Sequence, residues 1–506
     1  MNNRIRILVT GDLHGTVSPY DYRDHKETCK GLARLASLIT SLRDENTLLI
    51  DNGDCLTGSP LSLWHALNEP EEEHPMTTVM KALEYDYVNL GNHDFDIGEE
   101  ALAAHLEKTG ASCLTSNVTY RGEALGPTYA IEEIAGKKIA LFAITTHYTR
   151  FNIKRSLIRH IRFQDALETA RKTVSLIKDL EKPDYIIGIY HGGFERDLIN
   201  GYQTGSQNGE NQAYSILQEI TGIDLLITGH QHRSLTGTMN NTVYTQIAPQ
   251  GQELACIDIF TDTGVIEPHL LKADTPADDS ITALIQDKED ACSAWLDESL
   301  ARTAMDLTFN DPLFDRLRKP QAATLINRLQ KELTGADLSA CALSGTATGF
   351  GKNITMRDLV LSVPFPENLS VRKITGAQLR QYLEQTAVFW SIRNDTIVIS
   401  PYVMEPVPAL HRWIMVDGVT YTVRVSNDPG DRIRDLQYNG EEVTDDMEFT
   451  IAMNRSCLIN GFIDYALREM PSVRELPGNI ISLLADQLKE AETVSFEPEY
   501  NITVIK

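Results

Sequence analysis

Five short polar motifs in the first half of the chain combine residue types that bind divalent metal ions. Each follows an apolar run typical of a strand, and these runs cover residues 5–10, 47–50, 85–90, 185–190 and 225–228. The motifs are, in order, Gly11-Asp12-Leu13-His14, Asp51-Asn52-Gly53-Asp54, Gly91-Asn92-His93-Asp94, His191-Gly192-Gly193 and Gly229-His230-Gln231-His232. Because ligands of open α/β sheets bind at the carboxyl ends of the strands, we expect all five motifs to meet at one rim.

The candidate ligands are two aspartates, one asparagine and four histidines: Asp12, His14, Asp54, Asn92, His191, His230 and His232. Asp12 and His14 are two residues apart, and on extended backbone such a pair points the same way. The same holds for His230 and His232. Asp54 can bridge two cations through its two carboxylate oxygens.

We therefore predict two metal sites that share one carboxylate. The first takes Asp12, His14, Asp54 and His232, and the second takes Asp54, Asn92, His191 and His230. Mixed oxygen and nitrogen ligands suit Mn, Zn, Fe or Co. Two carboxylates facing two divalent ions leave a net charge of about +2, which favours phosphate binding and activation of water.

Each motif alone has a simpler interpretation. An Asp-x-His or Gly-His-x-His pair arises by chance, and Gly-Asn-His-Asp can form an Asx-type turn. Their repeated placement after strands favours a metal centre. The histidines outside these motifs have no partners in sequence and are expected at the surface: His25, His65, His74, His105, His160, His269 and His411.

Composition narrows the class of protein. The chain has 506 residues, enough for two or three domains. Its net charge is −25 with no basic tract, which argues against binding a nucleic-acid polymer through phosphate neutralisation. A metal pair would reverse the local field where an anionic substrate binds.

Cysteine usage and hydropathy bear on location. The seven cysteines form no CxxC pair, which indicates reduced thiols in an intracellular setting. Met1-Asn2-Asn3-Arg4 leads straight into the first strand, so we expect no signal peptide. Without a run of about 20 apolar residues we expect no membrane span. The predicted location is cytoplasmic.

The elements that must position the motifs alternate between strand and helix. Helical spacing of apolar residues predicts helices over 31–42 and 163–180, and further strands are expected over 138–144, 242–247 and 254–260. This alternation predicts an α/β domain with helices layered on a sheet.

A polar break separates a second region. Residues 273–280 contain Pro276, and Ser280 is expected to cap a linker helix. The predicted organisation is a metal-binding domain over 1–272, a linker helix over 273–300 and a mixed α/β domain over 301–506. Within the last we expect a helix over 322–334 and a strand over 419–425.

The motifs resemble a known family. GDLHG, DNGD, GNHDFD, YHGG and GHQH look like the signature blocks of the calcineurin-like dinuclear metallophosphoesterases. Residues 58–62 and 115–118 resemble its 5′-nucleotidase branch, and residues 354–368, 375–379, 418–421 and 430–433 resemble that branch's C-terminal domain. The resemblance implies a four-layer αββα sandwich plus a smaller mixed α/β substrate-binding domain. It also implies a catalytic dyad of His93 and Asp96 that stabilises the transition state and assists the leaving group.

The second domain departs from the family pattern. The family's Gly-Gly-Ile-Arg stretch is replaced by residues 344–350, which contain no arginine. Its stacking aromatic is replaced in Met453-Asn454-Arg455, although Phe462 follows nearby. The resemblance leaves four candidates for substrate contact: Phe365, Asn454, Arg455 and Phe462. Phe462 could equally be a core residue, and Arg455 could form a surface salt bridge.

The predicted function is hydrolysis of nucleotide phosphoesters by a metal-bound hydroxide. The substrates implied by the resemblance are nucleoside 5′-monophosphates or 2′,3′-cyclic nucleotides. One alternative is another hydrolase on the same scaffold, acting on UDP-sugars, dinucleotides or sulfur esters. A second is a metal-stabilised protein that binds nucleotides without turnover.

Overall fold

The chain forms two compact units, Met1–Cys292 and Ser293–Lys506. The structure is a computed structural model that describes residues 4–204, 207–364, 366–404, 408–459, 463, 467, 470–495 and 497–506. The boundary between the units falls inside the segment for which we expected a linker helix.

Unit 1 is built on two six-stranded sheets. The first has the order β17 (Val265–Lys272), β16 (Glu253–Phe260), β1 (Arg4–Thr10), β4 (Thr47–Asp51), β5 (Tyr87–Val88) and β6 (Ser112–Cys113). The second has the order β14 (Leu235–Met239), β15 (Thr242–Gln246), β13 (Leu225–Thr228), β12 (Tyr185–His191), β10 (Lys137–Thr145) and β9 (Ala130–Ile134). The strands that precede the polar motifs run parallel within each sheet, so their carboxyl ends point the same way.

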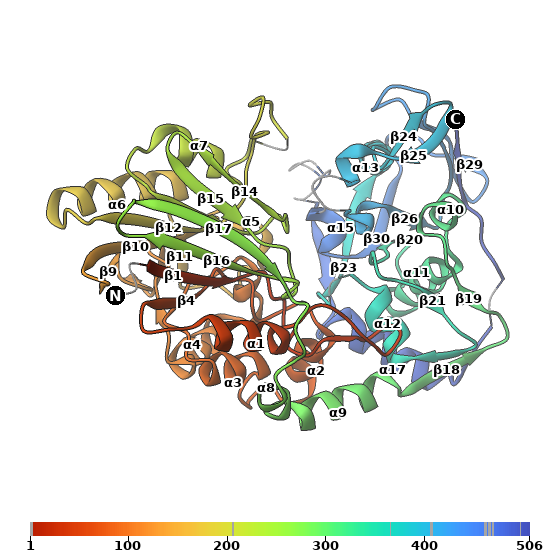
Figure 1. Cartoon of the computed structure of the whole chain (residues 1–506). Helices are drawn as coiled ribbons and strands as arrows, with labels where there is room; N and C mark the ends of the chain where they lie inside the picture. Colours follow the sequence, from red (N-terminus) through yellow and green to blue (C-terminus); the bar gives the residue numbers. More distant parts are fainter. Residues whose placement is uncertain are drawn as a thin grey trace. The chain divides into compact units, whose positions relative to one another are not determined.

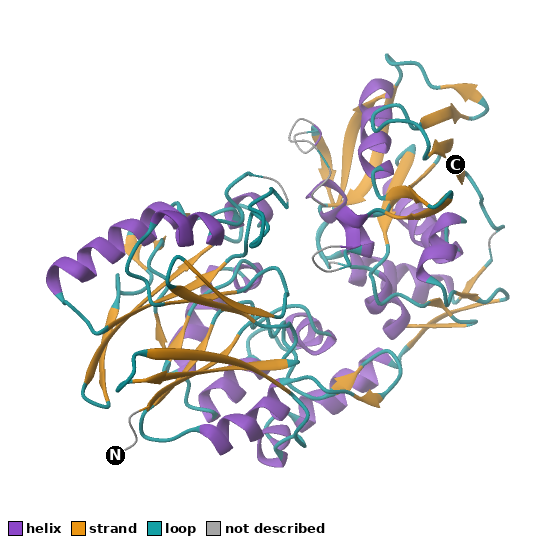
Figure 2. Ribbon diagram, turned by 45° about the horizontal axis from the view of Figure 1, so that its top comes forward, coloured by secondary structure: helices purple, strands orange, loops and turns teal. Residues whose placement is uncertain are grey.

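The two sheets share one apolar core. Ile7 of β1 and Ile187 of β12 are fully buried in the same cluster, together with alternate residues of the neighbouring strands. The outer face of the second sheet forms a separate cluster, in which Phe142 of β10 packs with Val174 of α6 (Ala166–Leu180). Because both faces of these strands are buried, their sequences are almost continuously apolar. Figure 2 shows the stacked sheets of unit 1 with helices outside them. The predicted four-layer αββα arrangement is confirmed.

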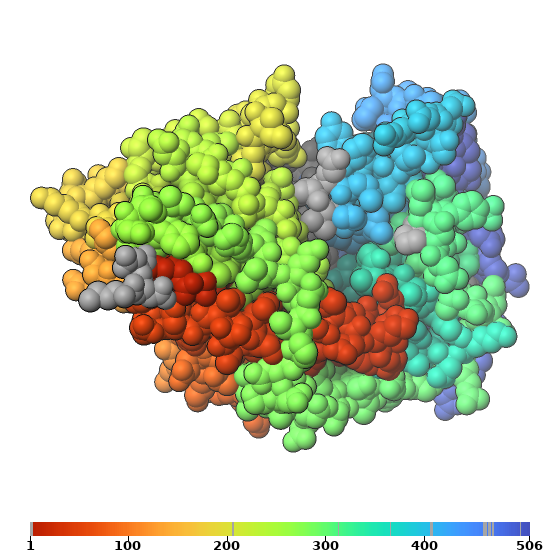
Figure 3. Space-filling model, viewed as in Figure 1, coloured from red at the N-terminus to blue at the C-terminus, as the bar shows by residue number. Residues whose placement is uncertain are grey.

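Two helices of the structure correspond to those predicted from the helical spacing of apolar residues. Helix α1 (Leu32–Leu42) follows Gly31, buries Leu35 and Ile39, and lies on the surface of unit 1 in Figure 3. Helix α6 begins later than expected because Asp165 caps it, its side chain accepting the N–H of Glu168. Phe163 instead ends β11 (Ile161–Phe163).

The other elements of unit 1 lie around the sheets (Figure 1). They are β2 (Tyr20–Asp21), β3 (Lys26–Glu27), α2 (Pro60–Asn68), α3 (Pro75–Ala82), η1 (His93–Ile97), α4 (Glu99–Thr109), β7 (Val118–Tyr120), β8 (Glu123–Ala124), α5 (Thr149–Asn152), α7 (Ala213–Glu219) and α8 (Asp279–Ala283).

The expected linker helix is two helices. Asp278, not Ser280, caps α8, because its side chain accepts the N–H groups of Ser280 and Ile281. Helix α9 (Gln286–Leu296) then crosses the boundary between the units. An aspartate two residues earlier therefore has the capping role that we expected of Ser280.

Unit 2 contains several small sheets and helices. Its five-stranded sheet has the order β26 (Ile414–Asp417), β20 (Leu338–Ala342), β30 (Glu448–Asn454), β23 (Leu369–Thr375) and β31 (Ser472–Glu475). Its four-stranded sheet has the order β29 (Glu441–Glu442), β28 (Ile433–Tyr438), β27 (Thr420–Arg424) and β33 (Ile502–Ile505). The shorter strands are β18 (Ser299–Thr303), β19 (Leu307–Thr308), β21 (Gly349–Phe350), β22 (Asn353–Thr355), β24 (Trp390–Arg393), β25 (Thr396–Ile399) and β32 (Thr493–Val494).

The helices of unit 2 include the one predicted over 322–334. It is α11 (Gln321–Thr334), and its buried Asn327 donates to the carbonyl of Met415 and accepts from Ser339 Oγ. The strand expected over 419–425 is β27. The remaining helices are α10 (Pro312–Leu317), α12 (Met356–Ser362), α13 (Gly376–Ala387), α14 (Pro401–Met404), η2 (Leu410–Arg412), α15 (Ser456–Ile459) and α17 (Ile480–Ala491).

Candidate metal centre

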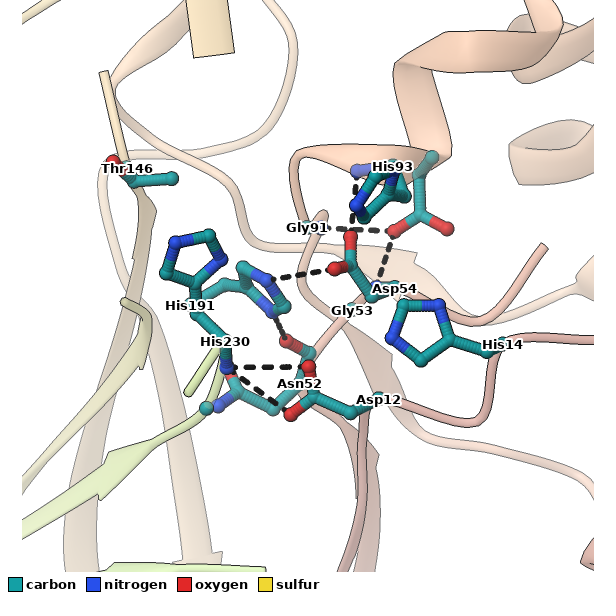
Figure 4. A network of polar contacts seen from close by, with 12 residues as sticks. Asp12, His14, Asn52, Gly53, Asp54, Gly91, His93, Thr146, His191 and His230 are labelled. Carbon is teal, nitrogen blue, oxygen red and sulfur yellow. Dashed lines mark hydrogen bonds and ion pairs between the residues drawn. The ribbon is translucent and has the colours of Figure 1, made fainter. Parts of the chain in front are cut away.

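The candidate ligands of unit 1 gather into two adjacent groups. Asp12, His14 and His232 form one, and Asp54, His191 and His230 form the other; within each group the ligand-capable atoms lie within 4.8 Å of one another. Figure 4 shows side chains of both groups facing a common space. Each group contains three of the four residues predicted for one site, with Asp54 in the second group only.

The motifs occupy the rims of two sheets, so the expectation of one rim was wrong. Asp12, Asp54 and Asn92 follow β1, β4 and β5 of the first sheet, whereas His191 ends β12 and His230 follows β13 of the second. The carboxyl ends of both parallel strand sets point to the same place. The centre therefore lies where the two sheets meet.

The expected extended backbone at the paired ligands was also wrong. Asp12 and His14 both have φ of 49°, and His230 and His232 have φ of 70° and 56°. Asp54 is left-handed too, with φ of 57°. Such backbone costs about 1–3 kcal/mol per residue and persists only where surrounding contacts impose it.

Hydrogen bonds between the loops impose this backbone. The N–H of Asp12 donates to the carbonyl of Gly53 at 2.8 Å, and the N–H of His14 donates to the carbonyl of Asp54 at 2.8 Å. The pairing of β1 with β4 thus continues into the loops and turns Asp12 and His14 towards Asp54.

Two asparagines tie the sheets together beneath the centre. Asn52 Nδ2 donates to the carbonyl of Tyr190 at 3.2 Å, and Asn89 Nδ2 donates to the carbonyl of Ile144 at 2.9 Å. Asn89 Nδ2 also lies 3.1 Å from Asn52 Oδ1. These buried bonds fix the distance between the rims that carry the ligands.

Asp94 holds the backbone around Asp54. Its carboxylate accepts four N–H groups, from Asp54, Cys55, Leu56 and Gly91, at 2.8–3.1 Å. Gly91 is required here because a Cβ would lie 2.1 Å from Asp54 Oδ1. Asp94 was noted in the sequence only as part of its motif; its role depends on the loop after β4, which the sequence does not place.

Two ligand histidines are oriented by backbone carbonyls. His14 Nδ1 lies 3.0 Å from the carbonyl of Thr57, and His191 Nδ1 lies 2.7 Å from the carbonyl of Asn52. Each carbonyl accepts the Nδ1 proton, so Nε2 faces the centre and would bind a cation in its deprotonated form. Accordingly, His191 Nε2 lies 3.2 Å from Asp54 Oδ2, and His14 Nε2 lies 2.9 Å from His232 Nε2.

The buried carboxylates of the pocket require positive charge beside them. Burial opposes ionisation of Asp54, but the facing imidazoles of His191 and His93 outweigh it and lower the pKa of its carboxyl well below the usual range. Burial likewise opposes protonation of His191, yet Asp54 and Asp12 raise its pKa to about 9. In the metal-free chain, protons on histidine supply the positive charge that the buried carboxylates demand.

The donor set fits a pair of divalent ions. Asn92 Oδ1 is buried and has no hydrogen-bond partner among the described residues. An orphaned buried amide oxygen is costly, and a cation beside it would remove that cost. Carboxylate, amide and imidazole donors without thiolates match transition metals of borderline softness.

His93 lies beside this donor set. Its Nδ1 is 2.7 Å from Asp96 Oδ2, and its backbone N–H donates to Asp54 Oδ1 at 2.7 Å. Burial would lower the pKa of His93, but Asp54 and Asp96 raise it to about 10. An imidazolium next to the centre can stabilise negative charge on a phosphoryl group.

The candidate substrate residues lie in unit 2. Asn454 ends β30, is buried, and its Oδ1 accepts from Ser456 Oγ at 2.9 Å. Arg455 follows directly and is partly buried. Phe365 and Phe462 lie outside the described residues.

Two histidines expected at the surface are buried. His65 is 5% exposed and His105 is 3% exposed. His105 Nδ1 lies 2.7 Å from Thr77 Oγ1, so its burial is paired with a hydrogen bond. An isolated histidine has no sequence pattern that distinguishes these two outcomes.

Comparison with known families agrees with the fold. The calcineurin-like phosphoesterases match residues 5–234, and the 5′-nucleotidase C-terminal domain matches residues 304–467. A trifunctional nucleotide phosphoesterase, YfkN of Bacillus subtilis, is 25% identical over 89% of this chain, which spans only 35% of that protein. A 2′,3′-cyclic-nucleotide 2′-phosphodiesterase/3′-nucleotidase of Yersinia enterocolitica is 25% identical over 89% of this chain and 80% of its own length.

A solved structure extends the likeness to the whole chain. A Staphylococcus aureus protein assigned to the 5′-nucleotidases and solved with α-ketoglutarate has a TM-score of 0.92, with 26% identity over 99% of this chain and 100% of its own. Together the two domain matches and these relatives account for both units. The chain belongs to the calcineurin-like phosphoesterases that carry a 5′-nucleotidase C-terminal domain, a family of phosphoester hydrolases.

Proposed function

We propose that this protein hydrolyses the phosphoesters of nucleotides at a centre of two divalent cations. The observation that carries the proposal is the pair of three-residue donor groups on facing rims, one of which contains Asp54. The proposed substrates are nucleoside 5′-monophosphates or 2′,3′-cyclic nucleotides. The names of the Yersinia and Bacillus relatives support this substrate class.

The proposed ligands follow the two groups. One ion would bind Asp12, His14, Asp54 and His232; the other would bind Asp54, Asn92, His191 and His230. One oxygen of Asp54 lies near Nε2 of His191, and the other accepts the N–H of His93, so both contacts hold the carboxylate that would be shared by the two ions. The orphaned oxygen of Asn92 completes the second set.

The chemistry divides between the ions and the chain. When bound, a pair of divalent cations polarises phosphoryl oxygens and makes a water-derived nucleophile available near neutral pH. The two sheet rims would supply the ligands of the ions, and Asp96 holds the ring of His93 through its Nδ1. We propose that His93 offsets charge on the transferring phosphoryl group and handles the leaving group.

We propose Mn, Zn, Fe or Co as the metals because the donors are oxygen and nitrogen. Seven side chains contribute, and carboxylate oxygens are too few among them for the oxygen-rich sites that Ca²⁺ prefers.

Asn454 and Arg455 are the described candidates for substrate contact in unit 2. Arg455 would supply charge to phosphate or carboxylate in place of the arginine that residues 344–350 lack. Replacing Arg455 with alanine should raise KM more than it lowers kcat if this is its role. An unchanged KM would remove Arg455 from the substrate site.

The deciding experiment is a phosphoester panel on chelator-stripped protein, with single metals added back. Turnover of nucleoside 5′-monophosphates or 2′,3′-cyclic nucleotides that depends on the added metal supports the proposal. Preferential turnover of UDP-sugars, dinucleotides or sulfur esters would assign another substrate to the same scaffold. Tight nucleotide binding without turnover under any metal would identify a binding protein instead.

We also propose a cytoplasmic location. None of the seven cysteines forms a disulfide in the structure, as suits a reducing compartment. Among the described residues, no helix has both the length and the apolar character needed to cross a membrane. Fractionation of the native host, with the protein recovered outside the cytoplasm, would contradict this location.

A further inference from the structure

We propose that Glu210 is a positioning residue for the second metal ion, acting through His230. Its carboxylate accepts the Nε2 proton of His230 and so leaves Nδ1 of that ring to bind the ion. The inference rests on the proposed metal centre. It adds a residue that lies outside the five sequence motifs and in the loop between β12 and α7.

The contact itself is direct. Glu210 Oε1 lies 3.1 Å from His230 Nε2, and the histidine side chain is 14% exposed while the glutamate side chain is 31% exposed. Neutral imidazole carries one proton, so a carboxylate at Nε2 selects the tautomer with the lone pair on Nδ1. Figure 4 shows the ring of His230 beside that of His191, facing the same space.

The partner of His230 differs in kind from those of two other ligand histidines. His14 and His191 place their Nδ1 atoms against the neutral carbonyls of Thr57 and Asn52. His230 has a carboxylate instead. A charged acceptor makes the imidazole more basic and a stronger metal ligand than a neutral carbonyl does.

The loop that carries Glu210 is anchored to the strands behind the centre. Thr146 Oγ1 donates to the carbonyl of Glu210 at 2.7 Å, and the hydroxyl of Tyr190 donates to the same carbonyl at 3.4 Å. On its other side, the N–H of Gly193 donates to Asn211 Oδ1 at 2.7 Å. These bonds link Glu210 to the ends of β10 and β12, the strands that lead to Thr146 and His191.

A close backbone approach supports the same placement. Gly209 has φ of 86°, and a Cβ at this position would lie 2.8 Å from His147 Nε2. The positive φ favours glycine, and a side chain at this position would require the His147 ring to shift. The residue before Glu210 is therefore built to bring this segment against the end of β10.

The contact between Glu210 and His230 should affect the binding of only one of the two ions. His230 belongs to the group with Asp54 and His191, whereas the other group uses Asp12, His14 and His232. Loss of an outer-shell partner of a metal-bound histidine typically costs 10–100-fold in metal affinity. We therefore expect Glu210 variants to weaken the second ion and leave the first unchanged.

The test is a Mn²⁺ titration of chelator-stripped full-length protein, followed by calorimetry and by the spin-coupled electron paramagnetic resonance signal of a Mn pair. Wild type should bind two ions per chain. Glu210→Ala should lower the affinity for the second ion about 10–100-fold. When one equivalent of Mn²⁺ is added beyond the amount that fills the first site, the spin-coupled signal should be absent. Glu210→Gln keeps an acceptor oxygen but not the charge, and should give a smaller loss.

Glu219→Gln is the matched control. Glu219 pairs with Arg171 on the surface of unit 1, so this variant removes the same charge without touching the centre. It should bind both ions as wild type does. Thermal unfolding of the metal-free variants checks that each is folded. If Glu210→Ala does not fold, Glu210→Gln provides the test.

Three outcomes would overturn the inference, and they are distinguishable. If wild type binds a Mn pair and folded Glu210→Ala binds it equally well, Glu210 has no positioning role and the proposed function stands. Equal weakening of both ions by Glu210→Ala would also contradict the selective role. If wild type binds no metal pair, the proposed function fails and this inference fails with it.

Discussion

Nδ1 of His93 lies 2.7 Å from Oδ2 of Asp96, three residues further along the same 3₁₀ turn. The pair is therefore local in sequence. Asp54, which reaches His93 through the backbone N–H, adds a second negative charge beside the ring. Burial opposes protonation, but the two carboxylates raise the pKa of His93 to about 10, so the ring is cationic at neutral pH.

Replacing His93 with asparagine should lower turnover by about 10²–10⁴-fold, because a cation beside the phosphoryl group is lost. The metal content should stay at about two ions per chain. Steady-state kinetics and elemental analysis of the same preparation measure both quantities. Loss of metal in this variant would instead make His93 a ligand or a structural residue.

Replacing Asp54 with alanine should abolish activity and metal loading together. Asp54 belongs to one donor group and is the proposed shared ligand of both ions, so neither ion would keep its full ligand set. Elemental analysis after metal loading and desalting is the measurement, with circular dichroism as the check on folding. Near-normal turnover in folded Asp54→Ala protein would refute the ligand assignment.

Substitution of Asp94 should mainly lower stability, whereas substitution of Asp96 should mainly lower catalysis. Asp94→Ala leaves four backbone N–H groups without their acceptor and should cost on the order of 3 kcal/mol of unfolding free energy. Asp96→Ala alters a half-exposed side chain and should change stability by about 0.5 kcal/mol or less. Urea unfolding of the two metal-free variants tests this.

The effects of these two substitutions on catalysis should not follow their effects on stability. Asp96→Ala should lower kcat in fully folded protein, since His93 loses its partner. If Asp96→Ala destabilises the protein as much as Asp94→Ala does, the division of roles between these aspartates is wrong.

Acid should destabilise unit 1 partly through His105. Burial lowers the pKa of His105 to about 4, whereas the unfolded chain has the ordinary value of 6.5. Between these values the unfolded state binds the proton and the folded state does not, so stability is complete above pH 6.5 and falls as pH drops towards 4. His105 should account for about 2 kcal/mol of the loss between pH 7 and pH 5.

The check on this prediction is urea unfolding of chelator-stripped wild type and His105→Gln at both pH values. The variant cannot take up the proton, so its loss between pH 7 and pH 5 should be smaller by about that amount. An equal loss in the two proteins would show that His105 does not contribute to the acid response.

The sequence predicts the elements whose signal is local and strong. β12 and β13 are buried on both faces, so their uninterrupted apolar runs identified them. β5 was expected over 85–90 but covers only Tyr87–Val88. The N–H of Leu90 donates to the side chain of Thr115, a contact from outside the strand that no local pattern shows.

Six of the seven predicted ligands fall into the two donor groups, but their backbone geometry could not be predicted. Asp12 and His14 were grouped correctly because each follows β1 in a short motif. Their left-handed backbone was not foreseen, because hydrogen bonds to the loop after β4 impose it. Glu210 had no signal, since it lies in a loop and its role depends on where that loop packs.

The backbone N–H of His230 donates to Asp12 Oδ1 at 3.2 Å across a separation of 218 residues. Closing so long a stretch of chain is entropically unfavourable, and contacts this distant form late during folding. Neither donor group exists until the strands of both sheets of unit 1 have come together. Metal uptake by a refolding chain should therefore report the completion of unit 1, lagging behind the appearance of helical and strand signals.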